Sequence, residues 1–310
     1  MNIIFMGTPD FAIPVLDELY QEHQISAVFT APSKKAGRSQ QLTHPPVYQH
    51  ADILGIPVHQ PHTLNNPQTI AVITELKPDV IVVAAYGQFI PSKILTLPPL
   101  GCWNIHPSLL PLHRGPSPVV TTIVNRDITT GVTIIKLDDK MDSGPILDQV
   151  SYDLNLTETT PYLTKALFGL GSQLLRNSLS TVQTTGTIAE KQQNHSLATY
   201  TTKVVRTDGL IDWDSSTLEI ESRLRAYTPW PSSFTHWRGK IIKIIESEYI
   251  EQSKPQNYAS GTVLHSDNKI QIVTRDGALI VSTLQLEGKR AVTASDFVLG
   301  YPDIIGSELG

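Results

Sequence analysis

Short apolar runs alternate with amphipathic stretches over most of the first half of the chain, and this alternation constrains the fold more than any other feature. The run 79–85 (DVIVVAA) is β-branched and apolar on both faces, as is typical of a central parallel strand. Further strands are predicted at 2–6, 25–30, 57–59, 101–106 and 131–137, with helices at 11–22, 68–77 and 159–182. This order predicts an α/β fold with a doubly wound, mostly parallel sheet.

The pattern changes near residue 190, where a polar stretch without helical periodicity begins. A helix is predicted at 218–227, followed by short strands at 240–250, 261–264, 269–274 and 278–286. Several short strands separated by turn signals are typical of a small antiparallel barrel. We therefore predict a first domain over 1–189, a linker over 190–206 and a small OB-like β-barrel domain over 207–310.

Composition narrows the class of protein. The 310 residues carry 24 Lys and Arg against 29 Asp and Glu, and the net charge of -5 excludes nucleic-acid binding through overall positive charge. No apolar run approaches the roughly 18 residues that a membrane span needs. The single cysteine, Cys102, excludes an intrachain disulfide and favours a cytoplasmic setting, and we expect it to be a small buried hydrophobic residue. The histidines between 44 and 62 lack metal-ligand spacing, so no metal is predicted.

Asn104 and His106 are the first residues whose types and spacing suggest catalysis. They lie two positions apart at the end of a predicted central strand, so their side chains face the same way. This edge of an open α/β sheet is where ligands bind. An amide can donate to a developing oxyanion, and an imidazole can exchange protons near neutral pH. On its own, however, the pair more often marks an ordinary polar strand end.

Two neighbouring segments extend the candidate site. A proline-rich turn at 107–111 presents fixed backbone groups that suit recognition of the polar edge of a flat heterocycle. The acidic loop 138–144 contains Asp142, whose carboxylate can fix the tautomer of His106, stabilise its imidazolium or hold a proton-shuttling water. An isolated Asp-Ser-Gly would otherwise indicate only a turn.

Taken together, these motifs resemble the formyltransferases that use 10-formyltetrahydrofolate. The resemblance rests on Asn104-x-His106, Ser108-Leu-Leu-Pro111 and the Asp142-Ser-Gly loop. Gly7-Thr-Pro-Asp-Phe-Ala12 and the late segment that begins at Ile211-Asp-Trp213 look like the members that act on methionyl-tRNA. The similarity covers nearly the whole chain and implies a Rossmann-like formyltransferase domain followed by a tRNA-binding barrel.

The resemblance implies transfer of a formyl group from 10-formyltetrahydrofolate to the α-amino group of methionyl initiator tRNA, for translation initiation. By matching position, Asn104 and His106 would stabilise the oxyanion, and Asp142 would support His106. Neither a metal nor a covalent nucleophile is implied. The folate would be lined by two segments, whose members are Tyr86, Gly87, Gln88, Phe89 and Ile90, and Ser108, Leu109, Leu110 and Pro111.

A basic loop at 31–43 supplies the first predicted tRNA contacts. It contains Lys34, Lys35 and Arg38, and no acidic residue lies between Glu22 and Asp52. Three cations without counter-charge suit phosphate contact, although a solvated surface loop is the plainer interpretation. The resemblance adds that Arg38 falls on the position of a functional arginine.

The second domain adds weaker nucleic-acid signals. Lys203 and Arg206 open a mildly basic stretch, and we predict that they contact the tRNA. Trp213, Trp230 and Trp237 could stack on bases, but we expect all three to be core residues. Nothing in the sequence requires more than a monomer.

Four other functions share parts of this pattern. A formyltransferase acting on an amino-sugar nucleotide would have the same catalytic core, but it would not need the basic loop. A formyltetrahydrofolate hydrolase would use the same three residues on water. A glycinamide ribonucleotide formyltransferase would lack the second domain. A non-enzymatic tRNA-binding protein would need none of Asn104, His106 and Asp142.

Overall fold

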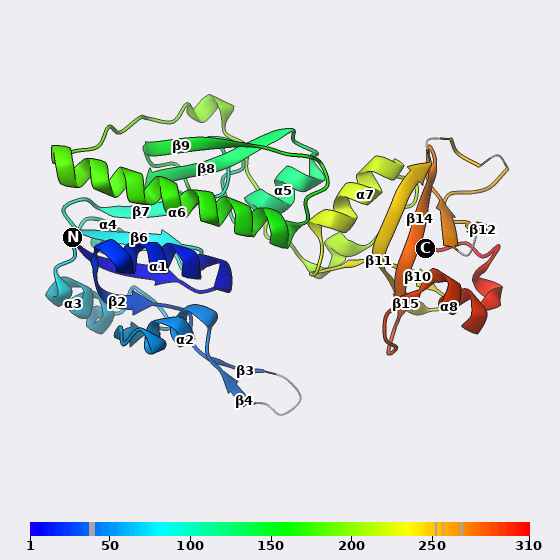
Figure 1. The fold of residues 1–310 in the computed structure, drawn as a ribbon, viewed down its shortest axis with the longest axis horizontal. Coiled ribbons are helices and arrows are strands. Elements are labelled where there is room, and N and C mark those ends of the chain that lie inside the picture. The colour runs from blue at the N-terminus through cyan, green and yellow to red at the C-terminus, as the bar shows by residue number, and fades with distance from the viewer. Residues whose placement is uncertain (37–40, 252, 256, 267–268) are drawn as a thin grey trace. The chain divides into compact units, whose positions relative to one another are not determined.

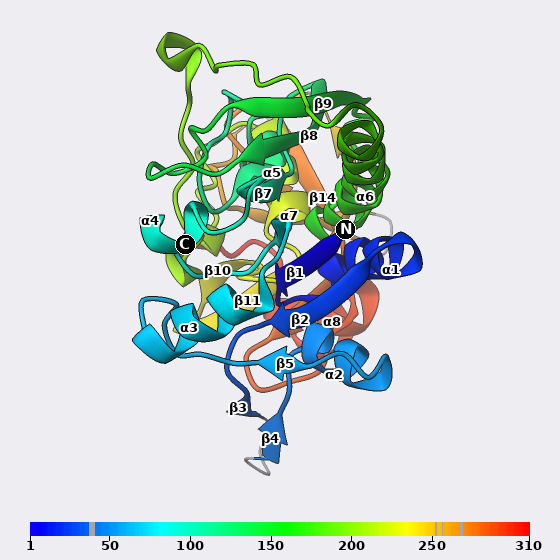
Figure 2. The ribbon, with the colours of Figure 1, turned by 90° about the vertical axis from the view of Figure 1, so that its left-hand side faces the viewer.

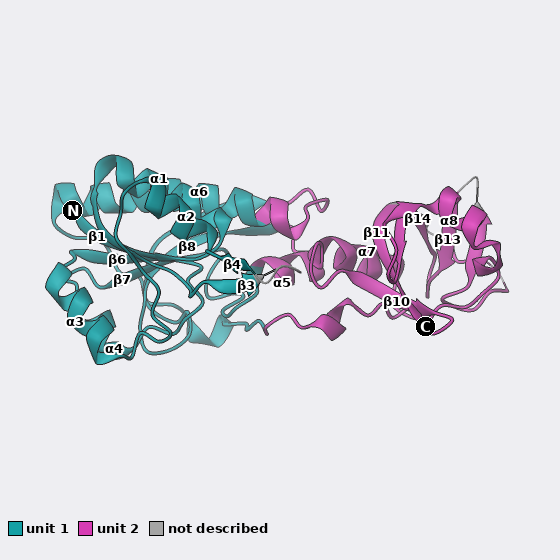
Figure 3. Cartoon of the chain, turned by 90° about the horizontal axis from the view of Figure 1, so that it is seen from below, with its two compact units in different colours: residues 1–118, 129–153, 164–201 teal, residues 119–128, 154–163, 202–310 magenta. Residues whose placement is uncertain are grey.

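The computed structural model describes residues 1–36, 41–251, 253–255, 257–266 and 269–310, and it divides into two compact units (Figure 3). Unit 1 comprises Met1–Pro118, Thr129–Asp153 and Thr164–Thr201. Unit 2 comprises Val119–Ile128, Leu154–Leu163 and Thr202–Gly310. The chain therefore leaves unit 1 twice before its final exit. The sequence predicted two continuous domains, 1–189 and 207–310, joined by a linker over 190–206, and this division stays a prediction.

Unit 1 is built on a seven-stranded sheet with the order β5-β2-β1-β6-β7-β8-β9 (Figure 2). The four pairs from β5 to β7 are parallel, and the two pairs from β7 to β9 are antiparallel. The mostly parallel sheet predicted from the sequence is thus confirmed. The strands are β1 (Asn2–Gly7), β2 (Gln24–Phe29), β5 (Val58–His59), β6 (Val80–Ala84), β7 (Cys102–His106), β8 (Thr129–Lys136) and β9 (Ile146–Asp153).

Helices cover both faces of this sheet, which explains why β6 is apolar and buried at every position (Figure 3). One face carries α1 (Ile13–Glu22), α2 (Pro46–Ile53) and the part of α6 (Thr160–Thr185) that belongs to unit 1. The other face carries α3 (Pro67–Leu76) and α4 (Ser92–Leu95), whose Ile73 and Ile94 pack with Ile81. A 3-10 turn, η1 (Asp10–Ala12), precedes α1, and η2 (His195–Leu197) lies near the end of unit 1.

The loop predicted at 31–43 contains a short antiparallel ladder between β3 (Lys34–Ala36) and β4 (Gln41–Thr43) (Figure 1). The loop prediction was therefore wrong for these two stretches. Lys34 pairs with Thr43 and Lys35 with Leu42, so backbone pairing orders a segment whose side chains show no strand-like pattern. Residues 37–40, including Arg38, lie outside the described residues.

Unit 2 is a small antiparallel β domain, as predicted, with the strand order β10-β11-β14-β13-β12 and β15 paired to β14 (Figure 1). Its strands are β10 (Ser233–Trp237), β11 (Lys240–Glu251), β12 (Val263–Ser266), β13 (Lys269–Val273), β14 (Ala278–Leu286) and β15 (Val292–Thr293). Its helical segments are η3 (Arg206–Gly209), α7 (Thr217–Ala226), α8 (Ala294–Gly300) and η4 (Pro302–Ile304), and α5 (Pro118–Val124) joins it from the middle of the chain.

The core of unit 2 gathers Trp213 and Trp237 with aliphatic residues from the sheet and from α7. Trp230 is different, because 58% of it is exposed. The expectation that all three tryptophans belong to the core is therefore wrong for Trp230. It lies in the turn that follows α7, between Pro229 and Pro231, where the chain leaves the helix before β10 begins.

None of the helices that the structure describes has the length and hydrophobicity that a membrane span requires.

Candidate active site

The carboxyl end of β7 carries Asn104 and His106, as the sequence predicted. This strand lies where the sheet changes from parallel pairing with β6 to antiparallel pairing with β8. His106 is almost fully buried, and Asn104 is half-buried. Because side chains alternate along a strand, the two residues present their polar groups on the same face.

The imidazole of His106 is oriented from both sides. Its Nε2 lies 3.0 Å from the main-chain oxygen of His113. A carbonyl oxygen only accepts hydrogen bonds, so Nε2 carries a proton and donates it. The other ring nitrogen, Nδ1, faces Oδ1 of Asp142 at 3.7 Å.

Asp142 approaches His106 from the acidic loop after β8. Its Oδ2 accepts a hydrogen bond from the amide of Gly115 (2.8 Å), so one carboxylate oxygen is fixed and the other faces the imidazole. The loop packs tightly, because a Cβ on Gly144 would lie 1.9 Å from the carbonyl oxygen of Lys136. The structure thus brings the predicted Asp142 and His106 side chains together.

The side chain of Asn104 has no hydrogen-bond partner among the described residues. Its neighbour His106 is held by His113 and faces Asp142, so the Asn104 amide is the group at this strand end that stays available to a ligand. An amide in this state can donate to an oxyanion without first breaking a bond inside the protein.

The segment 86–90 follows β6 at the same edge of the sheet. Tyr86 and Ile90 are buried, and Gly87 has a left-handed backbone (φ 84°). Gln88 donates through its side chain to the carbonyl of Pro61 (2.9 Å), whereas Phe89 is 70% exposed. Within the described part of the chain, the main chain of 87–90 makes no hydrogen bonds, so its amides and carbonyls are available to a ligand.

Tyr86 adds a buried hydroxyl that has no partner among the described residues. Its side chain packs in the apolar cluster under the segment, and burial raises the pKa of the phenol well above its usual range. The hydroxyl therefore stays protonated and neutral at any physiological pH.

The turn at 108–111 is held by the protein itself. Ser108 is fully buried, and its hydroxyl donates to the carbonyl of Leu112 (2.6 Å). The hydroxyl of Thr133 on β8 donates to the carbonyl of Ser108 and accepts from the amide of Leu110. Most polar groups of this turn are thus already paired within the protein. The main-chain groups that are available to a ligand lie instead in the segment 87–90.

Comparisons with known proteins place this chain in a family. Residues 1–179 match the family model described as formyl transferase, and residues 203–302 match the formyl transferase C-terminal domain. Methionyl-tRNA formyltransferases of Roseiflexus castenholzii and Rickettsia canadensis are 42% and 39% identical to the chain. These alignments cover 100% and 97% of this chain and 99% and 97% of the relatives. The chain belongs to the methionyl-tRNA formyltransferase family. The resemblance predicted from the sequence is confirmed.

Solved structures, among them that of another formyltransferase, share the fold of this family member. An N-formyltransferase from Helicobacter canadensis, solved with folinic acid and dTDP-3-aminofucose, is 18% identical with a TM-score of 0.64. The match covers 90% of this chain and 98% of that one. HypX from Aquifex aeolicus is 15% identical with a TM-score of 0.66, over 99% of this chain and 49% of HypX. At these identities the likeness shows the fold alone.

The predicted tRNA contacts of this family member are spread over both units. Lys34 and Lys35 are exposed on β3 in unit 1, and Lys203 and Arg206 are exposed at the start of the 202–310 part of unit 2. Arg38 lies outside the described residues.

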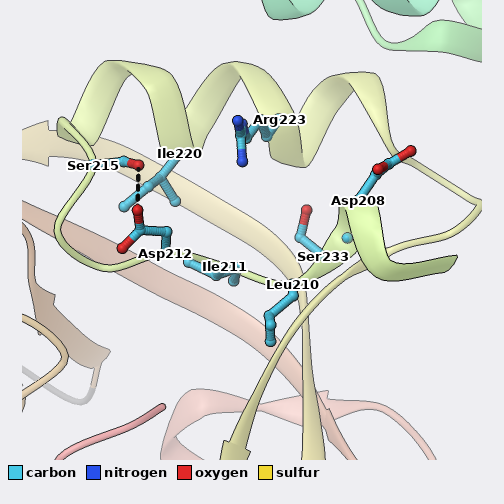
Figure 4. A pocket seen from close by; sticks show the side chains of 9 residues that line it. Asp208, Leu210, Ile211, Asp212, Ser215, Ile220, Arg223 and Ser233 are labelled. Carbon is cyan, nitrogen blue, oxygen red and sulfur yellow. Dashed lines mark hydrogen bonds between the residues drawn. The ribbon is translucent and has the colours of Figure 1, made fainter. Parts of the chain in front are cut away.

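A small cleft in unit 2 lies between α7 and the start of β10 (Figure 4). Its lining includes Arg223, Asp212 and Ser233, whose buried hydroxyl has no partner among the described residues. The cleft has room for about one water molecule. The cleft is therefore too small for a substrate.

Cys102, the first residue of β7, is fully buried, as predicted, and burial raises the pKa of its thiol to about 12. It is therefore no nucleophile at neutral pH. Within the described ranges, no group of three or more His, Cys, Asp or Glu side chains is arranged to hold a metal ion.

Sequence reasoning missed two buried residues behind Asp142, namely Arg114 and Gln193. Gln193 lies in the polar stretch that was predicted to be a linker, and its local sequence carries no signal of burial. Only its contacts across the fold, which are described below, indicate a role.

Proposed function

We propose that this chain transfers the formyl group of 10-formyltetrahydrofolate to the α-amino group of methionyl initiator tRNA. The observation that carries the proposal is the arrangement of His106, Asp142 and Asn104. Nδ1 of His106 faces the carboxylate of Asp142. The side chain of Asn104, which has no hydrogen-bond partner among the described residues, lies two positions before His106 on β7. All three lie at the edge of the sheet where ligands bind in such folds. The full-length relatives named methionyl-tRNA formyltransferase support the choice of acceptor.

In this proposal the folate lies against the segments 86–90 and 108–111. The flat pteridine ring carries several donors and acceptors along one edge, and the unpaired main chain of 87–90 offers complementary groups. The buried side chains of Tyr86, Ile90 and Leu110 supply apolar surface beside them. These residues therefore fit the cosubstrate. The two segments are completed by Gly87, Gln88, Phe89, Ser108, Leu109 and Pro111.

The reaction needs no covalent enzyme intermediate. The α-amino nitrogen attacks the formyl carbon, a C–N bond forms and the carbonyl oxygen becomes an oxyanion. The amide of Asn104 and the protonated imidazole of His106 stabilise this charge. The bond from carbon to N10 of the folate then breaks, and N10 takes up the proton that the attacking amine loses. His106, supported by Asp142, is suited to carry that proton between the two nitrogens.

The tRNA is proposed to contact Lys34, Lys35 and Arg38 in unit 1 and Lys203 and Arg206 in unit 2. These cations are few and the net charge is -5, so binding should be modest and strongly salt-dependent. Trp230 is the exposed tryptophan of unit 2 and is therefore the one suited to base stacking. We also propose that the protein acts in the cytoplasm as a monomer and requires no metal.

The experiment offers 10-formyltetrahydrofolate with four alternatives: methionyl initiator tRNA, methionyl elongator tRNA, an amino-sugar nucleotide or no acceptor. Mass spectrometry of the acceptor and release of tetrahydrofolate report the transfer. Formylation of the initiator tRNA alone is expected. Product only on the sugar would overturn the choice of acceptor, and folate turnover without any acceptor would indicate a hydrolase.

A further inference from the structure

Two buried polar side chains, Arg114 and Gln193, lie behind the loop that carries Asp142. They are 2% and 6% exposed, and both belong to unit 1. Burial of a guanidinium and an amide is costly unless their hydrogen-bonding groups are paired. Their partners therefore show what this pair does in the fold.

Gln193 uses both ends of its amide. Its Nε2 donates to the main-chain oxygens of Asp142 (2.9 Å) and Gly144 (2.7 Å). Its Oε1 accepts from Nε (3.1 Å) and Nη2 (2.7 Å) of Arg114. The guanidinium only donates and the two carbonyls only accept, so the amide has a single orientation that satisfies all four bonds.

The guanidinium of Arg114 makes two of its hydrogen bonds to Gln193. Among the described residues it forms no ion pair, and its other partners are Nδ1 of His195 (2.9 Å) and the hydroxyl of Tyr200 (3.3 Å). The guanidinium also lies 5.9 Å from the centre of the Tyr200 ring. All three partners come from the 191–201 segment.

That segment is tied to the chain beside Arg114 by main-chain bonds. The amide of Arg114 donates to the carbonyl of Thr199 (2.9 Å), and the amide of Thr201 donates to the carbonyl of Arg114 (2.8 Å). These main-chain bonds hold the 191–201 segment, which contains Gln193, beside Arg114.

The Asp142 loop needs such support. Asp142 has a left-handed backbone (φ 50°), a conformation that residues other than glycine seldom adopt. Gln193 binds the carbonyl of this residue and that of Gly144, on either side of Ser143. Without those two bonds the main chain on either side of Ser143 would lose this support, and among the described residues the hydrogen bond from the Gly115 amide would be left to hold the carboxylate beside His106.

We propose that Gln193, oriented by Arg114, is a positioning residue that holds the Asp142 carboxylate against Nδ1 of His106. This role rests on the proposed function of Asp142 and His106 in formyl transfer. Gln193 itself touches the backbone of the loop and none of the reacting atoms.

The test variant is Gln193→Glu. It keeps the size of the side chain and gives Arg114 a charged partner, but it replaces the Nε2 donor with an oxygen that faces two carbonyl oxygens. We expect kcat to fall about 10- to 100-fold, since a misplacement of about 1 Å costs this much. The KM values for folate and tRNA should stay within about twofold, because the substrate-binding segments are unchanged.

Gln193→Asn is a second variant, which buries no new charge but is too short to bridge Arg114 and the loop. It should show the same split between kcat and KM. Gln68→Glu is the matched control, because it adds the same charge at an exposed position of α3 and should leave both constants unchanged.

Two readouts separate this role from a merely structural one. Amide hydrogen exchange in 138–144 should become faster in both Gln193 variants, with the exchange of β7 and β8 unchanged. In an Asp142→Ala background, Gln193→Glu should cost no further activity, because a residue that acts through Asp142 has nothing left to position. Unchanged loop exchange or a full additional loss in that background would overturn the proposal.

Failure of the proposed function and failure of the positioning role would show in different measurements. If the wild-type protein formylated no methionyl-tRNA, the assay of the acceptors would show this before any variant is made. The exchange of 138–144 would still report whether Gln193 holds the loop, and unchanged exchange in both variants would overturn the positioning role.

Discussion

Oδ1 of Asp142 lies 3.7 Å from Nδ1 of His106, while Oδ2 of the same carboxylate accepts a hydrogen bond from the amide of Gly115. The distance between Oδ1 and Nδ1 is longer than a hydrogen bond, whereas the contact between Oδ2 and the Gly115 amide is a hydrogen bond. One oxygen thus anchors the carboxylate, and the other stays beside the imidazole. In the proposed mechanism this carboxylate supports the imidazole of His106 while it handles the proton.

Replacing His106 should remove catalysis and leave the fold intact. We expect His106→Ala to lower kcat by about 10²- to 10⁴-fold, the usual contribution of a general acid–base group. The affinity for tRNA should change by no more than a few-fold. Single-turnover formylation and a tRNA-binding assay measure the two effects. His62→Ala, at an exposed histidine, is the control; near-normal turnover of His106→Ala would contradict the mechanism.

Asn104→Asp tests the oxyanion donor. The side chain keeps its shape, but it puts a carboxylate where negative charge develops, so kcat should fall about 10²- to 10³-fold. The thermal midpoint should change little, because Asn104 has no hydrogen-bond partner among the described residues. Asn66→Asp is the control, since Asn66 caps α3 and Asp caps a helix equally well. A loss of stability without a loss of kcat would assign Asn104 a structural role.

Removing Lys34 and Lys35 should weaken tRNA binding through loss of phosphate contacts. Each lost contact should reduce the slope of log K against log salt by roughly 0.7–0.9. Titration of tRNA binding at several salt concentrations gives this slope for the wild type and for the double alanine variant. Lys165→Ala removes an exposed cation of α6 and should leave the slope unchanged. An unaltered slope in the double variant would exclude both lysines from the interface.

Two glycines of α6 should respond oppositely to alanine. A Cβ on Gly171 would lie 2.7 Å from Cγ2 of Ile105 on β7, whereas a Cβ on Gly169 meets nothing within 4 Å. Gly169→Ala should therefore stabilise the protein by up to about 1 kcal/mol through helix propensity. Gly171→Ala should destabilise it by about 1–3 kcal/mol through overpacking. Chemical denaturation of both variants measures the difference; equal shifts would show that the helix does not pack closely on β7.

Glu158 should make the stability of unit 2 depend on pH. Burial by itself raises the pKa of this carboxyl, but main-chain hydrogen bonds from Asn155 and Thr157 and the charge of Arg225 outweigh it, so the pKa lies below its usual value. The ionised form is thus favoured in the folded state. Its contribution is present above the unfolded pKa and is lost as the pH falls through the folded one.

Glu158→Gln should therefore destabilise the protein at pH 6, and the difference from the wild type should shrink on acidification. The free energy of unfolding of both proteins between pH 6 and pH 3 measures this. A difference that stays constant with pH would show that the charge of Glu158 contributes nothing.

Local patterns predicted the strands that carry the candidate site. The β-branched run at 79–85 is a central strand because it is apolar on both faces, and β6 confirms this. The spacing of Asn104 and His106 along a strand places both on one face whatever surrounds them. Asp142 needed the resemblance, because nothing in an isolated Asp-Ser-Gly indicates which residue its carboxylate will face.

Other elements escaped prediction for identifiable reasons. β9 has a polar, half-exposed pattern that differs from the apolar runs of the central strands. β10 begins directly after the prolines of the turn at 229–231, which obscure the start of a strand. Trp230 was expected in the core because of its residue type, whereas the turn carries it into solvent.

By itself, the sequence determined the α/β order of unit 1, the β character of unit 2, and the strand end that presents Asn104 and His106. These properties depend on periodicity and spacing along the chain. Only the tertiary structure decided that Nδ1 of His106 faces Asp142 and that Gln193 is buried behind the loop. Contacts between residues 36 and 51 positions apart arise when strands and loops pack, and the hydrogen-bond partners of a polar side chain are set by that packing.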